Sequence, residues 1–292
     1  MEGNYPSCRV TAVMEPAIPI PTLHLFPILD KMLIELLASL SSEEWHKSTI
    51  ARLWIVKDIA AHLLDGNVRG IAILNGHEAP PPAKPINNYQ DLVEFLNQLN
   101  ASWVNAMKRM SPQMLTQQLE DTGKLYTEYL KSLKPFEQAK FSVLWAGEET
   151  SLNWFHIARE YTEKWHHQQQ IRDAVGRPGI ITKELFLPCM DTFMYALPFT
   201  YRDIKADAGT MIEITISGDV GGNWYLQKTS YGWQLSKEAL LTNITSEVIL
   251  SPDTAWKLFT KAISPQIAMG LSTIKGNTSL AKTVFNTIAV MA

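Results

Sequence analysis

The sequence predicts a two-domain α+β protein, in which a bundle of four long helices precedes a small domain with an antiparallel sheet. Three observations predict this class. The chain has 292 residues, enough for two domains with a core each. Apolar residues recur at helical spacing through most of the first 178 residues. Beyond Pro178, short alternating segments separated by glycine-rich turns replace that pattern. We therefore expect domains at residues 1–178 and 179–292.

The helical pattern of the N-terminal domain divides into four long segments. They are residues 25–40, 53–73, 89–110 and 153–175. The last one ends at Gly176, which suits the left-handed conformation that follows a helix, and Pro178 comes shortly after. The run APPPAKP at residues 79–85 predicts a loop, because proline lacks the amide that a helix interior needs. Residues 113–133 predict a short extra helix.

The C-terminal domain shows a different sequence pattern. Alternating segments separated by the turns GDVGGN and SYG predict three antiparallel strands in a meander, and one more strand follows them. The strands are expected at residues 211–217, 224–228, 232–236 and 246–250, and helices at 185–199, 251–259 and 279–289. This is the pattern of a small sheet covered by helices.

Composition excludes several classes of function. The net charge is −3, and the basic residues are scattered, so we expect no nucleic-acid partner. The N-terminus lacks a basic segment followed by an apolar run, and no stretch of roughly 18 apolar residues occurs. Cys8 and Cys189 are far apart and lack a metal-binding spacing. We expect a cytoplasmic monomer or homodimer that acts on a small-molecule substrate, without membrane contact.

Ligand-type side chains form one stripe on the predicted helix at residues 153–175. His156, Glu160, Glu163 and His167 stand at i, i+4, i+7 and i+11, which keeps them within about 60° of one another. His166 lies about 100° from its neighbour, on another face. Glu163 and His167 therefore form the natural chelating pair. Read from His166 instead, the pair would end at Gln170, a poorer ligand.

The predicted helix at residues 53–73 offers a third ligand. His62 is embedded there in apolar sequence, with Asp58 four residues before it. Two neutral imidazoles, His62 and His167, and the Glu163 carboxylate are the donor set of catalytic zinc sites that keep one coordination position open. Asp58 would suit a role in orienting a histidine by accepting its other N–H. The alternative is structural: such pairs also arise on solvated helix faces, and a histidine among leucines is commonly a hydrogen-bonded core residue.

The motifs resemble a known family. The stretch TIARLWIVKDIAAHLLDGN and the later pattern ARE-x-TE-x-x-x-H-x-x-x-IRDAVGRP resemble the mycothiol-dependent maleylpyruvate isomerase N-terminal domain, a branch of the DinB-like metal-binding four-helix bundles. The resemblance covers about residues 22–178. It implies a divalent metal, commonly zinc, held by His62, Glu163 and His167. Many other DinB-like bundles carry His-x-x-x-His in the last helix, and Glu163 follows the isomerase branch. The stretches GDVGGNWYLQ, TSEVILS, DTAWKLFT and IKGNTSLAKTVF are similar to the sterol carrier protein-like domain that follows the bundle in those isomerases.

The resemblance implies an enzyme with one divalent metal, zinc or nickel, and a small-molecule thiol. A thiolate would add to an activated double bond, the carbon–carbon bond would rotate, and elimination would return the trans product; in S-transfer the thiol stays attached. The thiol would be mycothiol, another thiol such as bacillithiol, or absent. The same centre could polarise a carbonyl or activate water. One alternative is a non-enzymatic protein that binds an apolar ligand in its α+β domain, with a structural metal or none. Another is a paralogue that keeps the metal and has lost the catalytic activity. Arginines that could grip a substrate carboxylate are Arg69, Arg159, Arg172 and Arg202.

Overall fold

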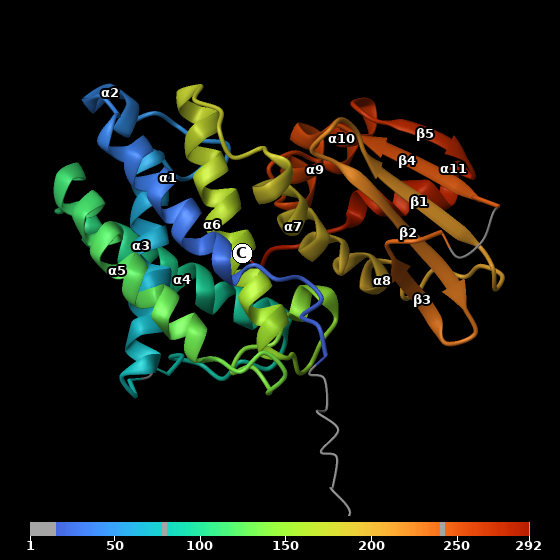
Figure 1. Cartoon of the computed structure of the whole chain (residues 1–292), viewed down its shortest axis with the longest axis horizontal. Helices are drawn as coiled ribbons and strands as arrows, with labels where there is room; N and C mark the ends of the chain where they lie inside the picture. The colour runs from blue at the N-terminus through green and yellow to red at the C-terminus, as the bar shows by residue number, and fades with distance from the viewer. Residues whose placement is uncertain (1–15, 78–80, 240–242, 292) are drawn as a thin grey trace, which may run out of the picture.

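A computed structural model describes residues 16–77, 81–239 and 243–291 of the chain. They form an N-terminal part of helices only and a C-terminal part in which helices cover a sheet (Figure 1). The predicted α+β class with two parts is therefore confirmed. Cys8 and the start of the expected proline-rich loop, Ala79 and Pro80, lie outside the described residues.

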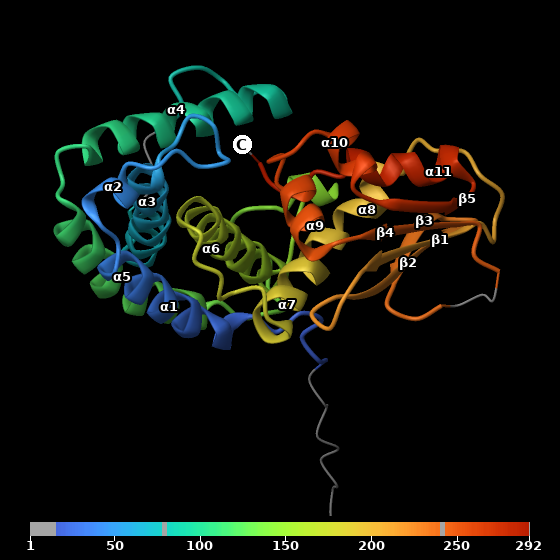
Figure 2. The ribbon, with the colours of Figure 1, turned by 90° about the horizontal axis from the view of Figure 1, so that it is seen from above.

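The bundle is built by four helices that contact one another. Helix α3 contacts α5 and α6, and α1 contacts the same two helices. Figure 2 shows α6 between the other bundle helices and the C-terminal part, and most of its side chains are buried. The bounds of these helices are α1 Phe26–Ala38, α3 Val56–Leu74, α5 Pro112–Ser132 and α6 Asn153–Val175.

Two expectations about bundle membership were wrong. Helix α4 (Tyr89–Met107) packs against the outside of α3, with the Trp103 indole donating a 2.8 Å hydrogen bond to the Ala61 carbonyl. The segment expected to be a short extra helix is α5, a 21-residue bundle member. The many polar side chains of α5 make its apolar stripe, which includes the buried Leu115 and Leu119, difficult to detect in the sequence. Gly123 lets α5 approach α1, because a Cβ there would lie 2.7 Å from an Asp30 carboxylate oxygen.

Local signals determine where the site-bearing helices begin and end. The Asp58 carboxylate accepts a 3.1 Å hydrogen bond from the Ile55 amide and so caps the start of α3. Helix α6 ends at Gly176, whose φ of 70° is left-handed as expected. The four-residue helix α2 (Ser42–Trp45) starts with a capping box between Ser41 and Glu44.

The sheet has the strand order β3-β2-β1-β4-β5 within the described residues. The β1–β2, β2–β3 and β4–β5 pairs are antiparallel, whereas β4 runs parallel to β1, with Val248 opposite Ile214. The parallel pair and β5 were not expected, because turn residues predict only hairpins between successive strands. The strands are β1 Met211–Ile216, β2 Gly222–Thr229, β3 Gly232–Ser236, β4 Ser246–Leu250 and β5 Thr273–Gly276.

Helices cover this sheet and differ in three places from the sequence prediction, one of which is the unexpected helix α10 (Pro265–Gly270). The expected helix at residues 185–199 is divided into α7 and α8 at Tyr195, and the final helix ends early and continues as a 3₁₀ turn. The bounds are α7 Lys183–Met194, α8 Ala196–Thr200, α9 Pro252–Phe259, α10 Pro265–Gly270 and α11 Thr278–Lys282, followed by the 3₁₀ turn Thr283–Asn286.

One apolar core runs through the boundary between the two parts. Trp165 of α6 and Trp256 of α9 are both buried, with ring centroids 6.5 Å apart. The Trp165 indole donates to the Ile180 carbonyl at 3.1 Å. At the surface, Lys257 forms a 3.5 Å ion pair with Asp173. The C-terminal part therefore packs directly on the helix that carries two of the predicted ligands.

Among the described residues, none of the helices has the length and apolar character needed to cross a membrane.

Candidate metal centre

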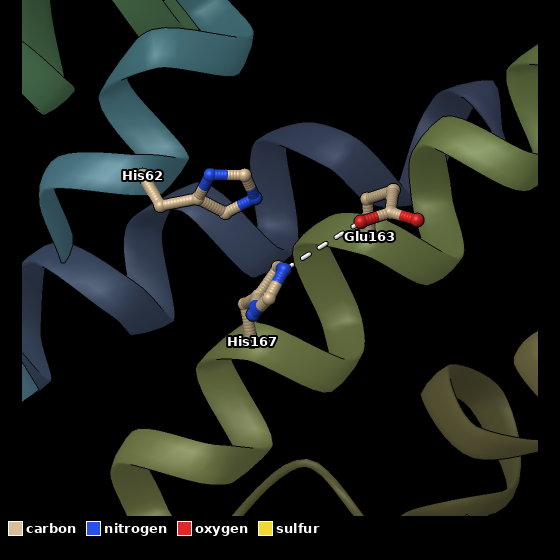
Figure 3. A group of neighbouring side chains, drawn as sticks. All are labelled: His62, Glu163 and His167. Carbon is tan, nitrogen blue, oxygen red and sulfur yellow. Dashed lines mark ion pairs between the residues drawn. The ribbon is translucent and has the colours of Figure 1, made fainter. Parts of the chain in front are cut away.

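Helices α3 and α6 bring the three residues predicted as ligands together. His62 lies on α3, and Glu163 and His167 lie one turn apart on α6. One ligand atom from each of the three lies within 4.8 Å of the others. Figure 3 shows their side chains pointing toward one another across the space between the two helices. The i, i+4 spacing on α6 and the packing of α3 against it are sufficient to build this arrangement.

A glutamine orients His167. Its Nδ1 lies 2.8 Å from the Gln170 side-chain oxygen, and its Nε2 lies 3.5 Å from a Glu163 carboxylate oxygen. With Nδ1–H donating to Gln170, Nε2 presents its lone pair to the site. The sequence reasoning missed this role. The spacing of His167 and Gln170, i and i+3 on one helix, is a signal that could have indicated it.

His62 lacks such an orienting bond. Its Nδ1 is buried and has no hydrogen-bond partner among the residues that the structure describes. The expectation that Asp58 would orient a ligand histidine was wrong, because the Asp58 carboxylate caps the start of α3 instead. A buried imidazole nitrogen without a partner is uncommon in folded proteins.

The protonation states suit metal coordination. Burial lowers the pKa of His62 well below its usual value, so this imidazole is neutral at pH 7. Burial alone would raise the pKa of Glu163, but the charged neighbours of this carboxylate, Arg159 among them, hold the pKa below its usual range. The group is therefore a carboxylate. Metal ligands of these types must be deprotonated, and these two are so without a metal.

His166 does not join the set, as expected. Its Nδ1 lies 2.7 Å from the Thr162 carbonyl, and its ring packs against His167 with centroids 3.9 Å apart. Burial lowers the pKa of His166 to about 3. This residue is a neutral core histidine next to the site.

The lower half of the polar stripe forms a separate cluster. The Glu160 carboxylate accepts 2.5 Å bonds from the Tyr126 hydroxyl and the Arg159 guanidinium. The same guanidinium lies 2.9 Å from Nδ1 of His156. Burial lowers the pKa of His156 to about 4. His156 and Glu160 are thus occupied by protein groups.

The four arginines considered as carboxylate-binding groups divide into two pairs. Arg172 donates to the Met32 and Pro178 carbonyls, and Arg202 donates to the Phe199 carbonyl, so both serve the backbone. Arg69 forms a 3.2 Å ion pair with buried Asp65, and its charge helps to lower the pKa of His62. The charge of Arg159 likewise helps to lower the pKa of Glu163. The second pair therefore lies within electrostatic range of the centre.

A further cation approaches from the C-terminal part. Lys261 follows α9, and its φ of 59° is left-handed. Although Lys261 is exposed, partial burial of its ammonium group lowers its pKa, and the charge of Glu163 opposes this shift. Lys261 was not predicted from the sequence, because it comes from the other domain.

The three residues fit a divalent metal. Two imidazoles and a carboxylate are a set that zinc accepts, with bonds of about 2.0–2.1 Å, which places tetrahedral ligand atoms about 3.4 Å apart. The spread of up to 4.8 Å is therefore closed by side-chain movements of about 1 Å. The convergence of the three ligand-type side chains and the hydrogen bond that orients His167 fit a donor set for such an ion.

One solved structure shows the same overall fold at low sequence identity, and two others match with lower TM-scores. A histidine-to-alanine mutant of the mycothiol-dependent maleylpyruvate isomerase matches with a TM-score of 0.53 and 11% identity, covering 87% of this chain and 91% of its own. The unmutated isomerase matches with a TM-score of 0.49 and 11% identity, covering 81% and 86%. A sterol carrier protein domain 2 of Helicoverpa armigera matches with a TM-score of 0.23 and 16% identity, covering 36% and 80%.

Sequence comparison identifies the helical part. Among curated proteins, no sequence matches the chain. The model of the mycothiol maleylpyruvate isomerase N-terminal domain family matches residues 27–172, half of the chain. This range contains His62, Glu163 and His167. The chain therefore belongs to the mycothiol maleylpyruvate isomerase N-terminal domain family.

Proposed function

We propose that this protein is a metalloenzyme that uses a small-molecule thiol either to isomerise small electrophilic substrates or to become attached to them as a thioether. The observation that carries the proposal is the convergence of His62, Glu163 and His167 from two helices, with ligand atoms within 4.8 Å of one another. Family membership supports thiol-dependent isomerisation as the reaction class. A divalent metal, zinc or nickel, would be held by these three side chains.

The residues of the site would have different roles in metal binding and in substrate binding. His62 and His167 contribute neutral imidazoles and Glu163 one negative charge, so three ligands leave a coordination position open. A divalent ion bound there would lower the pKa of a small-molecule thiol and so supply a nucleophilic thiolate at neutral pH. Lys261 would hold positive charge near an anionic substrate. The C-terminal part would cover the centre and shape the substrate pocket.

Metal content tests the first half of this proposal. We expect about one zinc or nickel ion for each purified wild-type chain, and loss of that ion in His167→Ala. His166→Ala is the matched control, because it removes the adjacent imidazole from outside the ligand set. Metal-free wild-type protein, or metal retained in His167→Ala, would overturn the metal site.

A thiol panel tests the reaction. The metal-loaded protein is incubated with mycothiol, bacillithiol or glutathione and cis-configured, electrophilic unsaturated acids, and the trans products and thioethers are quantified. We expect turnover that needs both a thiol and the metal. A loaded protein that turns over none of these combinations would leave the metal site standing and would exclude the proposed reaction.

A further inference from the structure

The two histidines of the centre are held in different ways. His167 donates from Nδ1 to Gln170 at 2.8 Å. His62 has a buried Nδ1 without a partner in the described part of the chain. A ligand histidine usually keeps its orientation through a hydrogen bond from its second ring nitrogen. Another contact must therefore hold the His62 ring.

Aromatic packing provides that contact. The Trp54 and His62 ring centroids lie 4.8 Å apart with 42° between the ring planes. His62 also contacts the His167 ring in an edge-to-face arrangement, with centroids 4.6 Å apart and 74° between the ring planes. Trp54 also approaches His167, at 6.0 Å. These separations lie within the range of favourable aromatic contacts. The rotation of the His62 ring is thus restricted by contacts with two neighbouring rings.

The backbone holds Trp54 firmly enough for this role. The Trp54 carbonyl accepts hydrogen bonds from the Thr49 hydroxyl at 2.7 Å and the Thr49 amide at 3.2 Å. Ser48 and Ile55 form an antiparallel bridge around the same loop. Asp58 then caps the Ile55 amide at the start of α3. Trp54 is therefore anchored two residues before the helix that carries His62.

We propose that Trp54 is a positioning residue for the metal centre, which holds the His62 imidazole in its ligand orientation by ring packing instead of a hydrogen bond. This inference rests on the proposed function, because it assigns His62 as a ligand. It differs from a purely structural role for the indole in one respect. The orientation of His62, and not only the stability of the fold, depends on the ring at position 54.

The first test reads the orientation of His62 without any metal. NMR signals of the labelled His62 ring, assigned with His62→Gln, are compared in wild type, Trp54→Phe and Trp54→Ala. We expect ring-current shifts in wild type that persist in reduced form in Trp54→Phe, and in Trp54→Ala a broadened signal near its random-coil position. An unchanged His62 signal in Trp54→Ala would overturn the inference, whether or not the protein binds metal.

The second test measures the consequence for binding. We expect the zinc dissociation constant to rise by about 10- to 100-fold in Trp54→Ala, the usual cost of losing a partner that orients a ligand, and to stay near wild type in Trp54→Phe. The visible spectrum of bound Co²⁺ should change in Trp54→Ala only. Trp103→Ala is the matched control, because this indole also packs on α3, through the Ala61 carbonyl. Equal losses in Trp54→Ala and Trp103→Ala would show a general structural effect and contradict the proposal.

These outcomes distinguish a failure of the proposed metal centre from a failure of the positioning role of Trp54. A wild-type chain that binds no metal would refute the proposed centre, and the NMR comparison would still decide whether Trp54 orients His62. Normal zinc affinity in Trp54→Ala would refute the positioning role and leave the centre intact.

Discussion

At the scale of single residues, burial and local hydrogen bonds prepare the centre before any ligand arrives. Burial keeps His62 neutral, and nearby positive charge such as that of Arg159 helps to keep Glu163 ionised. The sequence predicted that His62, Glu163 and His167 come together, because helical spacing and an isolated polar residue in an apolar helix are local signals. It did not predict Gln170 or Trp54, whose roles depend on side-chain orientation and on contacts between a loop and two helices.

Removing the Gln170 amide should weaken metal binding without much effect on the fold. We expect Gln170→Ala to raise the zinc dissociation constant by about 10- to 100-fold, because His167 loses the acceptor that fixes its tautomer. Competition with a chromophoric chelator measures this constant. Gln169→Ala is the control, since its side-chain oxygen has no partner among the described residues. If both variants bound zinc like wild type, Gln170 would have no role in orienting His167.

His156 should make the metal-free protein less stable in acid. Its folded-state pKa is about 4, against about 6.5 in an unfolded chain. The unfolded state therefore binds more protons between these values, and stability that is fully present above pH 6.5 is lost as the pH falls toward 4. The loss should be roughly 3 kcal/mol at most. Urea unfolding at pH 7 and 4.5 should show a smaller difference for His156→Gln than for wild type. The same difference in both proteins would contradict this assignment.

At the scale of helices, the sequence predicted well where the helices lie along the chain, but poorly which of them form the bundle. The periods of α1, α3 and α6 were read correctly, because their apolar positions form continuous stripes. Helix α4 shows the same period, yet it packs outside the bundle, and the more polar α5 lies inside it. Periodicity reports that a helix has an apolar face but not which neighbour covers that face. For α5, one such neighbour is the Asp30 carboxylate of α1, which lies against Gly123.

A buried ion pair fastens α6 to α1 and should be costly to break. Lys164 and Asp30 are joined at 2.6 Å, and their side chains are only 9% and 18% exposed. Lys164→Met leaves the Asp30 charge partly buried and alone, which should cost about 3–5 kcal/mol of unfolding free energy. Lys131→Met, which breaks the exposed pair with Glu128, should cost about 1 kcal/mol or less. Urea denaturation compares the two variants, and equal costs would contradict the account.

At the scale of the whole molecule, one buried cluster joins α6 and parts of α1 and α5 to the sheet, and a second cluster surrounds α3. Trp165 and Trp256 belong to the same buried cluster, which extends from α6 to strands β1, β2 and β4. The sequence showed a helical pattern that changes to a strand pattern near Pro178. Such a change carries no information about how the two parts pack against each other. This packing is what brings Lys261 near Glu163.

The shared core predicts cooperative unfolding of the metal-free protein. We expect a single thermal transition in which the helical far-ultraviolet signal and the tryptophan near-ultraviolet signal coincide. Trp256→Ala should lower stability by about 3–5 kcal/mol and shift both signals together. Two separated transitions, or a shift of only one signal, would show that the parts are independent domains.

The most direct test of the central claim is zinc X-ray absorption on the loaded protein, before and after addition of a small-molecule thiol. The account predicts two imidazole nitrogens and one carboxylate oxygen at about 2.0–2.1 Å, and then a new sulfur neighbour at about 2.3 Å when the thiol is added. A zinc environment without imidazole, or one that gains no sulfur with any thiol tested, would contradict a three-ligand centre that presents a thiolate.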